Sequence, residues 1–192
     1  MLNKIKKTAA GGDNIPHWIF SKCSFELADI VAHIFNCSLS TGILPVQWLS
    51  AVVTPVPKNT NPVSLSDFRP IYVTPILSRV VEKLAVNRWL RPAINPLDIA
   101  DQFGFRPTGS TTCALVFFMH HVTKMLETNS YVRCLLIDFS KAFDIVDHVT
   151  LLEKLDKLHL PDYCLNWIIS FLTSRTHTTK SRHLVSLPLG IN

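Results

Sequence analysis

One segment constrains the fold more than any other part of the chain: residues 132–148, which read VRCLLIDFSKAFDIVDH. The apolar run Leu135–Ile137 is followed at once by the carboxylate of Asp138. A short apolar run of this kind is typical of a buried strand. A strand that ends in an aspartate places negative charge at the sheet edge where ligands and metal ions gather. We therefore expect a strand that ends at Asp138 and then turns into a short helix.

Two interpretations of Asp138 follow from the residues alone. A buried charge without a partner is costly, and a divalent cation is the simplest partner for a strand-end aspartate. The alternative is an aspartate that caps the following helix. The nearby carboxylates of Asp144 and Asp147 favour the metal site, although two-metal chemistry needs more than one carboxylate close to the ions. We expect Asp144 and Asp147 to lie too far round the helix to complete such a metal site with Asp138. Phe143 should face the same cleft and form a wall against a ligand.

Composition limits the class of protein. The chain has 192 residues, is 47% hydrophobic and carries a net charge of +5 with a pI of about 9.0. This predicts one domain or two small ones and favours a polyanionic partner, nucleic acid first. No apolar run approaches the roughly 20 residues of a membrane span. Five cysteines without a C-x-x-C pair predict buried, reduced thiols and an intracellular location, with nucleus and cytoplasm both open.

Helical periodicity recurs along the chain, whereas strand-like runs are few. The expected helices begin at Ser24, at Pro75, near residue 111, at Thr150 with a capping box to Glu153, and at Pro161. The expected strands are residues 51–56, the run that ends at Asp138, and part of 176–192. Its prolines should keep residues 51–56 short or at a sheet edge. We therefore predict an α+β fold, since a doubly wound sheet needs more strands alternating with helices.

Three basic residues in loops are candidates for binding phosphate. Lys58 and Arg69 flank the polar loop at residues 57–70, and Arg106 lies in the sequence QFGFRP. Arginine holds phosphate as a fork, and lysine meets it as a point charge. The alternative for Lys58 is ordinary solvated charge. Arg69 and Arg106 each precede a proline and follow a phenylalanine, so stacking on an aromatic ring is a second interpretation for both.

Four segments, in this order, carry a resemblance to a known family. They are AAGGDNIP at residues 9–16, DFRPI at 67–71, QFGFRPTGST at 102–111 and LLIDFSKAFDIVDH at 135–148. The chain resembles the reverse transcriptase of non-LTR retrotransposons (long interspersed elements). The first segment differs from the family's pattern, because Gly12 stands where proline is usual. The last two segments are the specific ones.

The resemblance implies a partial right-hand polymerase fold. Residues 1–23 would be an irregular lead-in, 24–130 a fingers-like region and 131–192 part of the palm. The implied reaction of the intact parent enzyme is RNA-directed DNA synthesis, a nucleotidyl transfer that uses an RNA template, a DNA primer, dNTPs and Mg²⁺. The oligomeric state is left open.

The same resemblance assigns a role to each candidate residue. Asp138 would be the first metal-binding catalytic aspartate, and Phe139 would offer its backbone carbonyl to the ion. Phe143 resembles the aromatic gate that excludes nucleotides with a 2′-hydroxyl. Lys58 and Arg69 would lie near the incoming triphosphate or the template, and Arg106 would support the template.

One departure from the family limits the expected activity. The aromatic-Ala-Asp-Asp sequence of the second metal site does not occur here, and neither does the Gln-Gly block that shapes the nucleotide pocket. We therefore expect a truncated enzyme that is inactive alone and folds poorly. A non-catalytic nucleic-acid-binding module and a degenerate retroelement relic remain as alternatives. A phosphohydrolase of the haloacid dehalogenase type would need a second aspartate where Ser140 stands.

Overall fold

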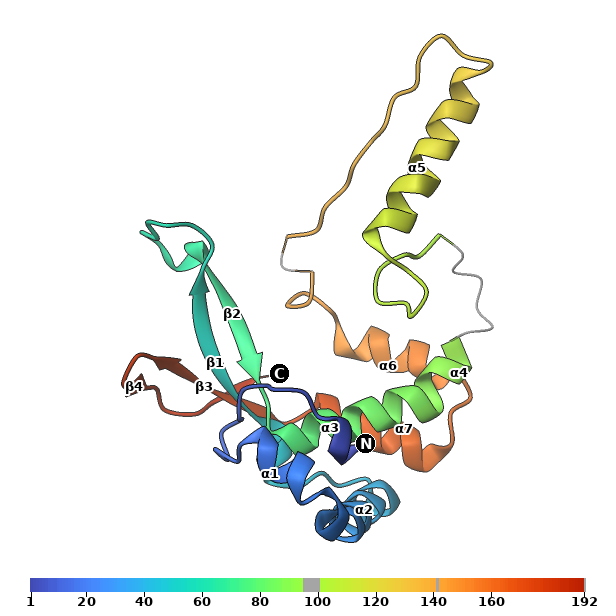
Figure 1. Ribbon diagram of the computed structural model, residues 1–192. Helices are drawn as coiled ribbons and strands as arrows, with labels where there is room; N and C mark the ends of the chain where they lie inside the picture. Colours follow the sequence, from blue (N-terminus) through green and yellow to red (C-terminus); the bar gives the residue numbers. More distant parts are fainter. Residues whose placement is uncertain (95–100, 141, 192) are drawn as a thin grey trace. The chain divides into compact units, whose positions relative to one another are not determined.

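The computed structural model describes residues 1–94, 101–140 and 142–191. The chain divides into two compact units (Figure 1). Unit 1 joins Met1–Ile94 to His148–Asn192, and unit 2 is Asn95–Asp147. The mixed helix and strand content agrees with the α+β prediction. The units divide the chain at other positions than the expected lead-in, fingers and palm.

Unit 1 is built around a five-stranded sheet. Its strands are β1 (Ser50–Pro57), β2 (Phe68–Val73), β3 (Arg175–Ser181), β4 (Leu184–Val185) and β5 (Leu189–Ile191). The order is β2-β1-β3-β4, with β5 also paired to β3. β1 is antiparallel to β2 and parallel to β3. The last two strands confirm the strand-like character expected after Arg175.

The position of β1 corrects one prediction. Its prolines led us to expect a short or edge strand, but β1 lies between β2 and β3. The register explains why this is tolerated. β3 pairs with β1 only over Ser50–Val53, whereas Pro55 and Pro57 lie beyond that stretch and face β2 alone. Because proline has no N–H to donate, it is compatible with the part of a strand that is paired on one side.

The helices of unit 1 largely follow the sequence prediction. They are α1 (His17–Lys22), α2 (Ser24–Thr41), α3 (Ile76–Ala85), α4 (Arg91–Ile94), α6 (His148–Asp156) and α7 (Asp162–Leu172), with short helical turns η1 (Leu2–Lys4), η2 (Val46–Leu49), η3 (Leu65–Asp67) and the wider turn η4 (Val86–Leu90) between α3 and α4. Gly42 ends α2 in a left-handed conformation, as expected. The lead-in is more regular than predicted, since η1 and α1 lie within it. α6 begins two residues before Thr150, so the expected capping box is wrong.

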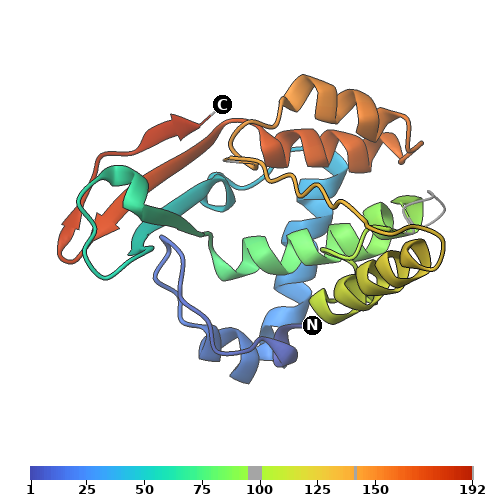
Figure 2. The ribbon, with the colours of Figure 1, turned by 90° about the horizontal axis from the view of Figure 1, so that it is seen from above.

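The core of unit 1 lies where α2, α3 and α7 meet η2. Trp167, at 2% exposure, packs with Trp48, Val81 and Cys164, and α6 lies beside α7 (Figure 2). The indole Nε1 of Trp167 donates a hydrogen bond to Ser38. Of the five cysteines, which are all free, only Cys164 is buried, so the prediction of buried thiols is wrong for the other four. Apolar neighbours in sequence do not bury a thiol on the exposed side of a helix, as at Cys37 and Cys113, or outside a helix, as at Cys23 and Cys134.

Unit 2 contains α5 (Thr111–Leu126), which starts where expected. The side chain of Ser110 accepts a hydrogen bond from the backbone N–H of Cys113 and so caps the helix. Within the described part of α5 no residue is buried, so the expected apolar face has no covering element there. Across the described residues, no helix is long and apolar enough to cross a membrane.

The segment that ends at Asp138 does not form the expected strand. Residues 131–139 have no regular secondary structure, and residues 142–145 form a turn instead of the expected short helix. A strand is stable only when neighbouring strands satisfy its backbone N–H and C=O groups. The described residues supply no strand that pairs with this segment. Its apolar composition alone was therefore not sufficient to fold it.

Candidate functional site

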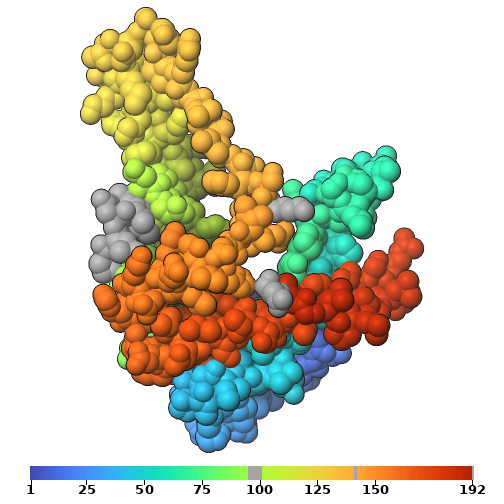
Figure 3. All heavy atoms as spheres, turned by 180° about the vertical axis from the view of Figure 1, so that it is seen from behind, coloured from blue at the N-terminus to red at the C-terminus, as the bar shows by residue number. Residues whose placement is uncertain are grey.

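Asp138 lies on an exposed segment of unit 2. The residues before it are also exposed, Leu136 to 86%. Figure 3 shows the atoms between α5 and residue 140, in yellow-orange, as a thin line of spheres. The structure therefore places this carboxylate in water and not at the end of a buried strand, which corrects the environment that we expected for it.

The residues around Asp138 do not form a metal centre. Among the described residues, no group of three or more His, Cys, Asp or Glu side chains could hold a metal ion. Phe139, whose carbonyl was assigned to the ion, lies on the same exposed segment. Asp144 and Asp147 do not share a helix with each other, because the chain forms a turn and an irregular stretch there. The described residues of this chain therefore do not supply by themselves the several carboxylates that a two-metal site needs.

Phe143 contacts an aromatic residue from another motif. Its ring lies edge-on to Phe105, with the two ring centroids 6.2 Å apart and the ring planes at 88°. Phe105 belongs to the QFGFRPTGST block and adopts a positive φ of 61°. Edge-to-face packing of this kind stabilises aromatic pairs. The structure thus brings the third and fourth sequence motifs together within unit 2.

The QFGFRPTGST block forms a compact loop before α5. Gln102 donates a side-chain hydrogen bond to the carbonyl of Gly104 at 3.0 Å, and Arg106 donates one to the carbonyl of Gln102 at 3.5 Å. A Cβ on Gly109 would lie 2.0 Å from the carbonyl oxygen of Phe103, so only glycine fits this turn. These local contacts set the position of Arg106 relative to α5.

Lys58 and Arg69 lie on one hairpin in unit 1. Arg69 pairs with Val56 across β1 and β2, and Lys58 directly follows the next pair, Pro57 with Phe68. The ammonium of Lys58 donates to the carbonyl of Ser66 at 2.6 Å and therefore closes the hairpin loop. The prediction that the two cations flank one loop is confirmed, and Lys58 also has a structural role that the sequence did not indicate.

A negatively charged cap holds the tip of this hairpin. The carboxylate of Asp67 accepts hydrogen bonds from the backbone N–H groups of Val63 and Ser64 at 2.9 and 2.8 Å. These two bonds, that from Ser64 first, lower the pKa of Asp67 below its ordinary value. The loop before Arg69 is thus ordered by its own side chains.

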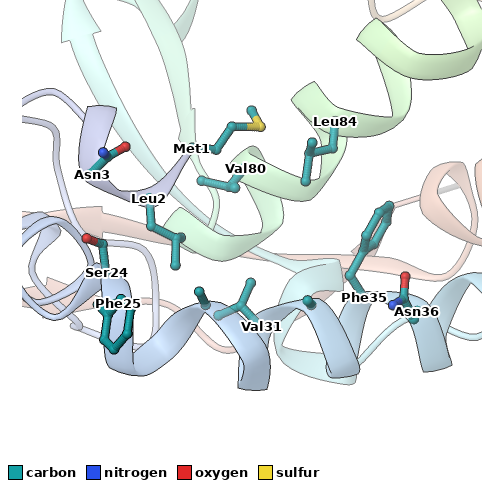
Figure 4. Close-up of a pocket in the computed structure, with 12 residues that line it drawn as sticks. Met1, Leu2, Asn3, Ser24, Phe25, Val31, Phe35, Asn36, Val80 and Leu84 are labelled. Carbon is teal, nitrogen blue, oxygen red and sulfur yellow. The ribbon is translucent and has the colours of Figure 1, made fainter.

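A separate pocket of about 450 Å³ lies between α2 and α3 (Figure 4). Val31 and Phe35 of α2 face Val80 and Leu84 of α3 across it, and η1 closes one side with Leu2. Its lining is mainly apolar and contains no ionisable side chain. This pocket offers no groups for acid–base or phosphate chemistry.

A basic pocket that the sequence did not indicate lies on another side of α3. Lys4 and Lys6 of the lead-in line it together with Arg79 and Lys83 of α3. The basic character of α3 was visible in the sequence. The approach of residues 4–8 to this helix was not, because it depends on contacts about 70 residues apart along the chain.

Comparison with known proteins identifies the family of this chain. The model of the family "Reverse transcriptase (RNA-dependent DNA polymerase)" matches residues 56–192. The chain belongs to the reverse transcriptase family. Its relatives place it with the reverse transcriptases of non-LTR retrotransposons, which confirms the resemblance seen in the sequence.

Three curated relatives illustrate this reverse transcriptase group. The chain is 28% identical over 184 residues to the probable RNA-directed DNA polymerase from transposon BS of Drosophila melanogaster, which covers 95% of the chain. It is 30% identical over 172 residues to the RNA-directed DNA polymerase from mobile element jockey of the same species, covering 88%. It is 23% identical over 175 residues to a Pol polyprotein from type-1 retrotransposable element R2 of Popillia japonica, covering 91%. The chain spans 20%, 19% and 24% of these relatives' own lengths.

Proposed function

We propose that this reverse transcriptase chain supplies the fingers and the first part of the palm of an RNA-directed DNA polymerase. The complete enzyme would extend a DNA primer with dNTPs on an RNA template. One observation carries the proposal: a single family match runs without a break from the Lys58–Arg69 hairpin, through the QFGFRPTGST block, to Asp138 and beyond.

The proposed roles of individual residues follow the family's motifs. Asp138, with the carbonyl of Phe139, would contribute to the Mg²⁺ site of a complete polymerase. Phe143 would exclude nucleotides with a 2′-hydroxyl, and its packing against Phe105 supports a position beside the loop that contains Arg106. Arg106 itself would contact the template.

Lys58 and Arg69 would act from the hairpin. Arg69 lies on β2 with its side chain exposed, so its guanidinium is accessible to a phosphate. The ammonium of Lys58 donates a hydrogen bond to the carbonyl of Ser66. We therefore assign to Lys58 both the ordering of the loop and a contact with the triphosphate. Both cations would face a polyanion in the fingers of the enzyme.

This chain alone should not polymerise. Two-metal phosphoryl transfer needs several carboxylates around the ions, and the described residues offer no such group near Asp138. A primed RNA template incubated with the chain, Mg²⁺ and all four dNTPs should therefore show no extension on a denaturing gel. Extension above that of a no-protein reaction would overturn this part of the proposal.

A chimaera tests the positive part. Residues 1–192 would replace the aligned segment of the jockey polymerase, which supplies the remaining length of the enzyme. The chimaera should extend the primer, and the substitution Asp138→Ala should abolish extension. Asp156→Ala, an exposed carboxylate on α6, is the matched control and should leave extension unchanged. Equal activity of the Asp138→Ala chimaera would contradict the assignment.

A non-catalytic nucleic-acid-binding module is the second candidate. The open surroundings of Asp138 and the basic pocket at α3 favour it. This candidate predicts salt-dependent RNA binding by the chain and no activity in the chimaera. An active chimaera would decide for the polymerase fragment.

A further inference from the structure

The basic pocket of unit 1 has a volume of about 540 Å³ and lies between the lead-in and α3. Pockets of this size accept groups as large as a nucleotide. Lys4 and Lys6 line it from the lead-in, and Arg79 and Lys83 line it from α3. No aspartate or glutamate is among its lining residues. Four positive charges therefore surround one hollow with no carboxylate among them.

The helix geometry aligns the α3 side of this pocket. Arg79, Lys83 and Asn87 are spaced four residues apart, so they lie on one face of the continuous helical stretch formed by α3 and η4. Two cations and an amide thus form a row along the helix. The side chains of Lys4, Lys6 and Lys83 are exposed and can reach a ligand in water.

Arg79 fixes the lead-in against the helix. Its guanidinium donates to the hydroxyl of Thr8 at 2.7 Å and to the carbonyl of Ala9 at 2.6 Å. Because these two bonds tie residues 8 and 9 to α3, Lys4 and Lys6 are presented on the same side as Lys83. The lead-in, which carries two of the pocket's lysines, is therefore held against α3 by hydrogen bonds.

The floor of the pocket is apolar. Ile5, Ile76 and Val80 contribute to it, and the lining contains no aromatic ring. Bases are commonly held by stacking on aromatic side chains. A site with cations but without such rings is suited to the backbone of a strand and not to its bases. Recognition here would be independent of sequence, since phosphates carry no base information.

We propose that this pocket binds the phosphate backbone of a single nucleic-acid strand. The inference rests on the proposed function, because a polymerase fragment has a strand to bind. It joins α3, which lies within the part that the family model matches, to lead-in residues 1–8, which lie outside that part. Lys4, Lys6 and Lys83 neutralise phosphates, and Arg79 positions the lead-in that carries two of them.

The test uses the full chain and labelled RNA and DNA strands of about 20 nucleotides. Binding is followed by fluorescence anisotropy between roughly 50 and 200 mM salt. The triple variant Lys4→Gln, Lys6→Gln and Lys83→Gln should bind both strands about 100-fold more weakly at 100 mM salt. The slope of log K against log salt should fall in magnitude by about 2, since each lost phosphate contact removes about 0.7.

A matched control separates this pocket from net charge. Lys22→Gln, Lys154→Gln and Lys157→Gln remove the same charge from exposed positions of unit 1 outside the pocket. This control should keep nearly the full affinity and slope of the parent chain. Circular dichroism melts of both triple variants should match the parent, because exposed lysines are replaced in each.

Three outcomes would overturn the inference. The first is an equal loss of affinity in the two triple variants, and the second is no loss of affinity in the pocket variant. The third is a parent chain that binds neither strand but does bind vesicles rich in phosphatidylserine. Each is independent of the chimaera assay. An inactive chimaera together with the expected loss of affinity in the pocket variant would contradict the proposed function and not this site. An active chimaera together with an unchanged affinity of the pocket variant would contradict this site and not the proposed function.

Discussion

Ser38 is a polar residue in the core of unit 1, and both of its hydrogen-bonding functions are used. Its hydroxyl accepts from the indole Nε1 of Trp167 at 3.1 Å and donates to the carbonyl of Ile43 at 2.7 Å. The residue is only 4% exposed. One oxygen therefore links α2, the loop that follows it, and α7. Buried polar groups of this kind are stabilising only while each partner is satisfied.

Ser38→Ala should destabilise unit 1 by about 2–4 kcal/mol, because it leaves the Trp167 N–H and the Ile43 carbonyl buried without partners. Urea unfolding followed by tryptophan fluorescence should show a lower midpoint with an unchanged m-value. Ser40→Ala is the matched control on the same helix. Ser40 is exposed, and its hydroxyl donates to the carbonyl of Cys37, so a change within about 0.5 kcal/mol is expected. Equal effects of the two substitutions would contradict this account.

Asp67 gives the hairpin tip a dependence on pH. Its folded-state pKa lies below the ordinary value of 3.8, chiefly because the backbone N–H groups of Ser64 and Val63 bond to the carboxylate. A lowered folded pKa means that the ordering is fully present above the unfolded pKa and is lost as pH falls through the folded value. The amide signals of Val63 and Ser64 should therefore shift in NMR spectra only at strongly acidic pH.

Asp67→Asn should remove this acid transition, since the amide keeps an acceptor oxygen and does not titrate. The Val63 and Ser64 signals of the variant should stay constant while those of the parent move. Asp156→Asn, on an exposed site of α6, controls for a lost carboxylate elsewhere in unit 1. An unchanged transition in Asp67→Asn would show that another group orders the hairpin tip.

At the scale of elements, one glycine sets how the lead-in meets α3. A Cβ on Gly11 would lie 2.4 Å from the backbone nitrogen of Pro75 and 2.6 Å from its Cα. Pro75 is the N-cap residue of α3, so no side chain can be placed on Gly11 without moving backbone. The neighbouring Gly12 has more room, with its nearest contact at 3.7 Å to a side-chain carbon of Val52.

Gly11→Ala should shift the lead-in away from α3 and lower the free energy of unfolding by about 1–3 kcal/mol, as overpacking does. Gly12→Ala is its matched control and should have little effect. Thermal melts by circular dichroism compare the two directly. A Gly11→Ala chain as stable as the Gly12→Ala chain would contradict the close approach seen here.

The elements also show how far the sequence predicts this fold. Long periodic helices such as α2, α5 and α7 were predicted to within a few residues, because their signals are local. β2 was missed, since Phe68–Val73 contains a proline and follows a polar loop, and only its pairing with β1 makes it a strand. The run before Asp138 was predicted as a strand for its composition, but without paired neighbours it stays irregular. Strand formation is decided by partners that a local pattern does not contain.

The residues of the candidate site also differ in whether their positions depend on local sequence or on tertiary contacts. Lys58 and Arg69 could be placed together from the sequence, because they flank one polar loop. The contact of Phe143 with Phe105 and the approach of Lys4 to Lys83 depend on tertiary structure. The motifs identify which residues are candidates for chemistry, whereas the structure decides which of them meet.

At the scale of the whole molecule, the two units differ in how well they bury apolar surface. Unit 1 has a core of tryptophan, valine and leucine side chains. In unit 2, α5 has no buried residue, and Leu136 and Phe143 are 86% and 80% exposed. Exposed apolar surface of this extent promotes association. Unit 2 should therefore be the source of any aggregation.

A chain without unit 2 tests this idea. Residues 95–147 would be replaced by a Gly/Ser linker of about 12 residues, which spans roughly 20 Å on average. All four tryptophans, at positions 18, 48, 89 and 167, lie in unit 1, so their fluorescence reports on that unit alone. The shortened chain should unfold cooperatively with the emission of a buried Trp167.

The full chain and the shortened chain should then differ in association and not in the core. Sedimentation velocity should show a single monomer species for the shortened chain and larger species for the full chain, because the exposed apolar residues of unit 2 are present only in the latter. The melting temperature of unit 1 should agree within a few degrees between them. If the shortened chain aggregated, or if its tryptophan emission matched that of unfolded protein, the core of unit 1 would depend on unit 2. Unit 2 would then be needed to complete the fold of unit 1 as well as to carry a candidate site.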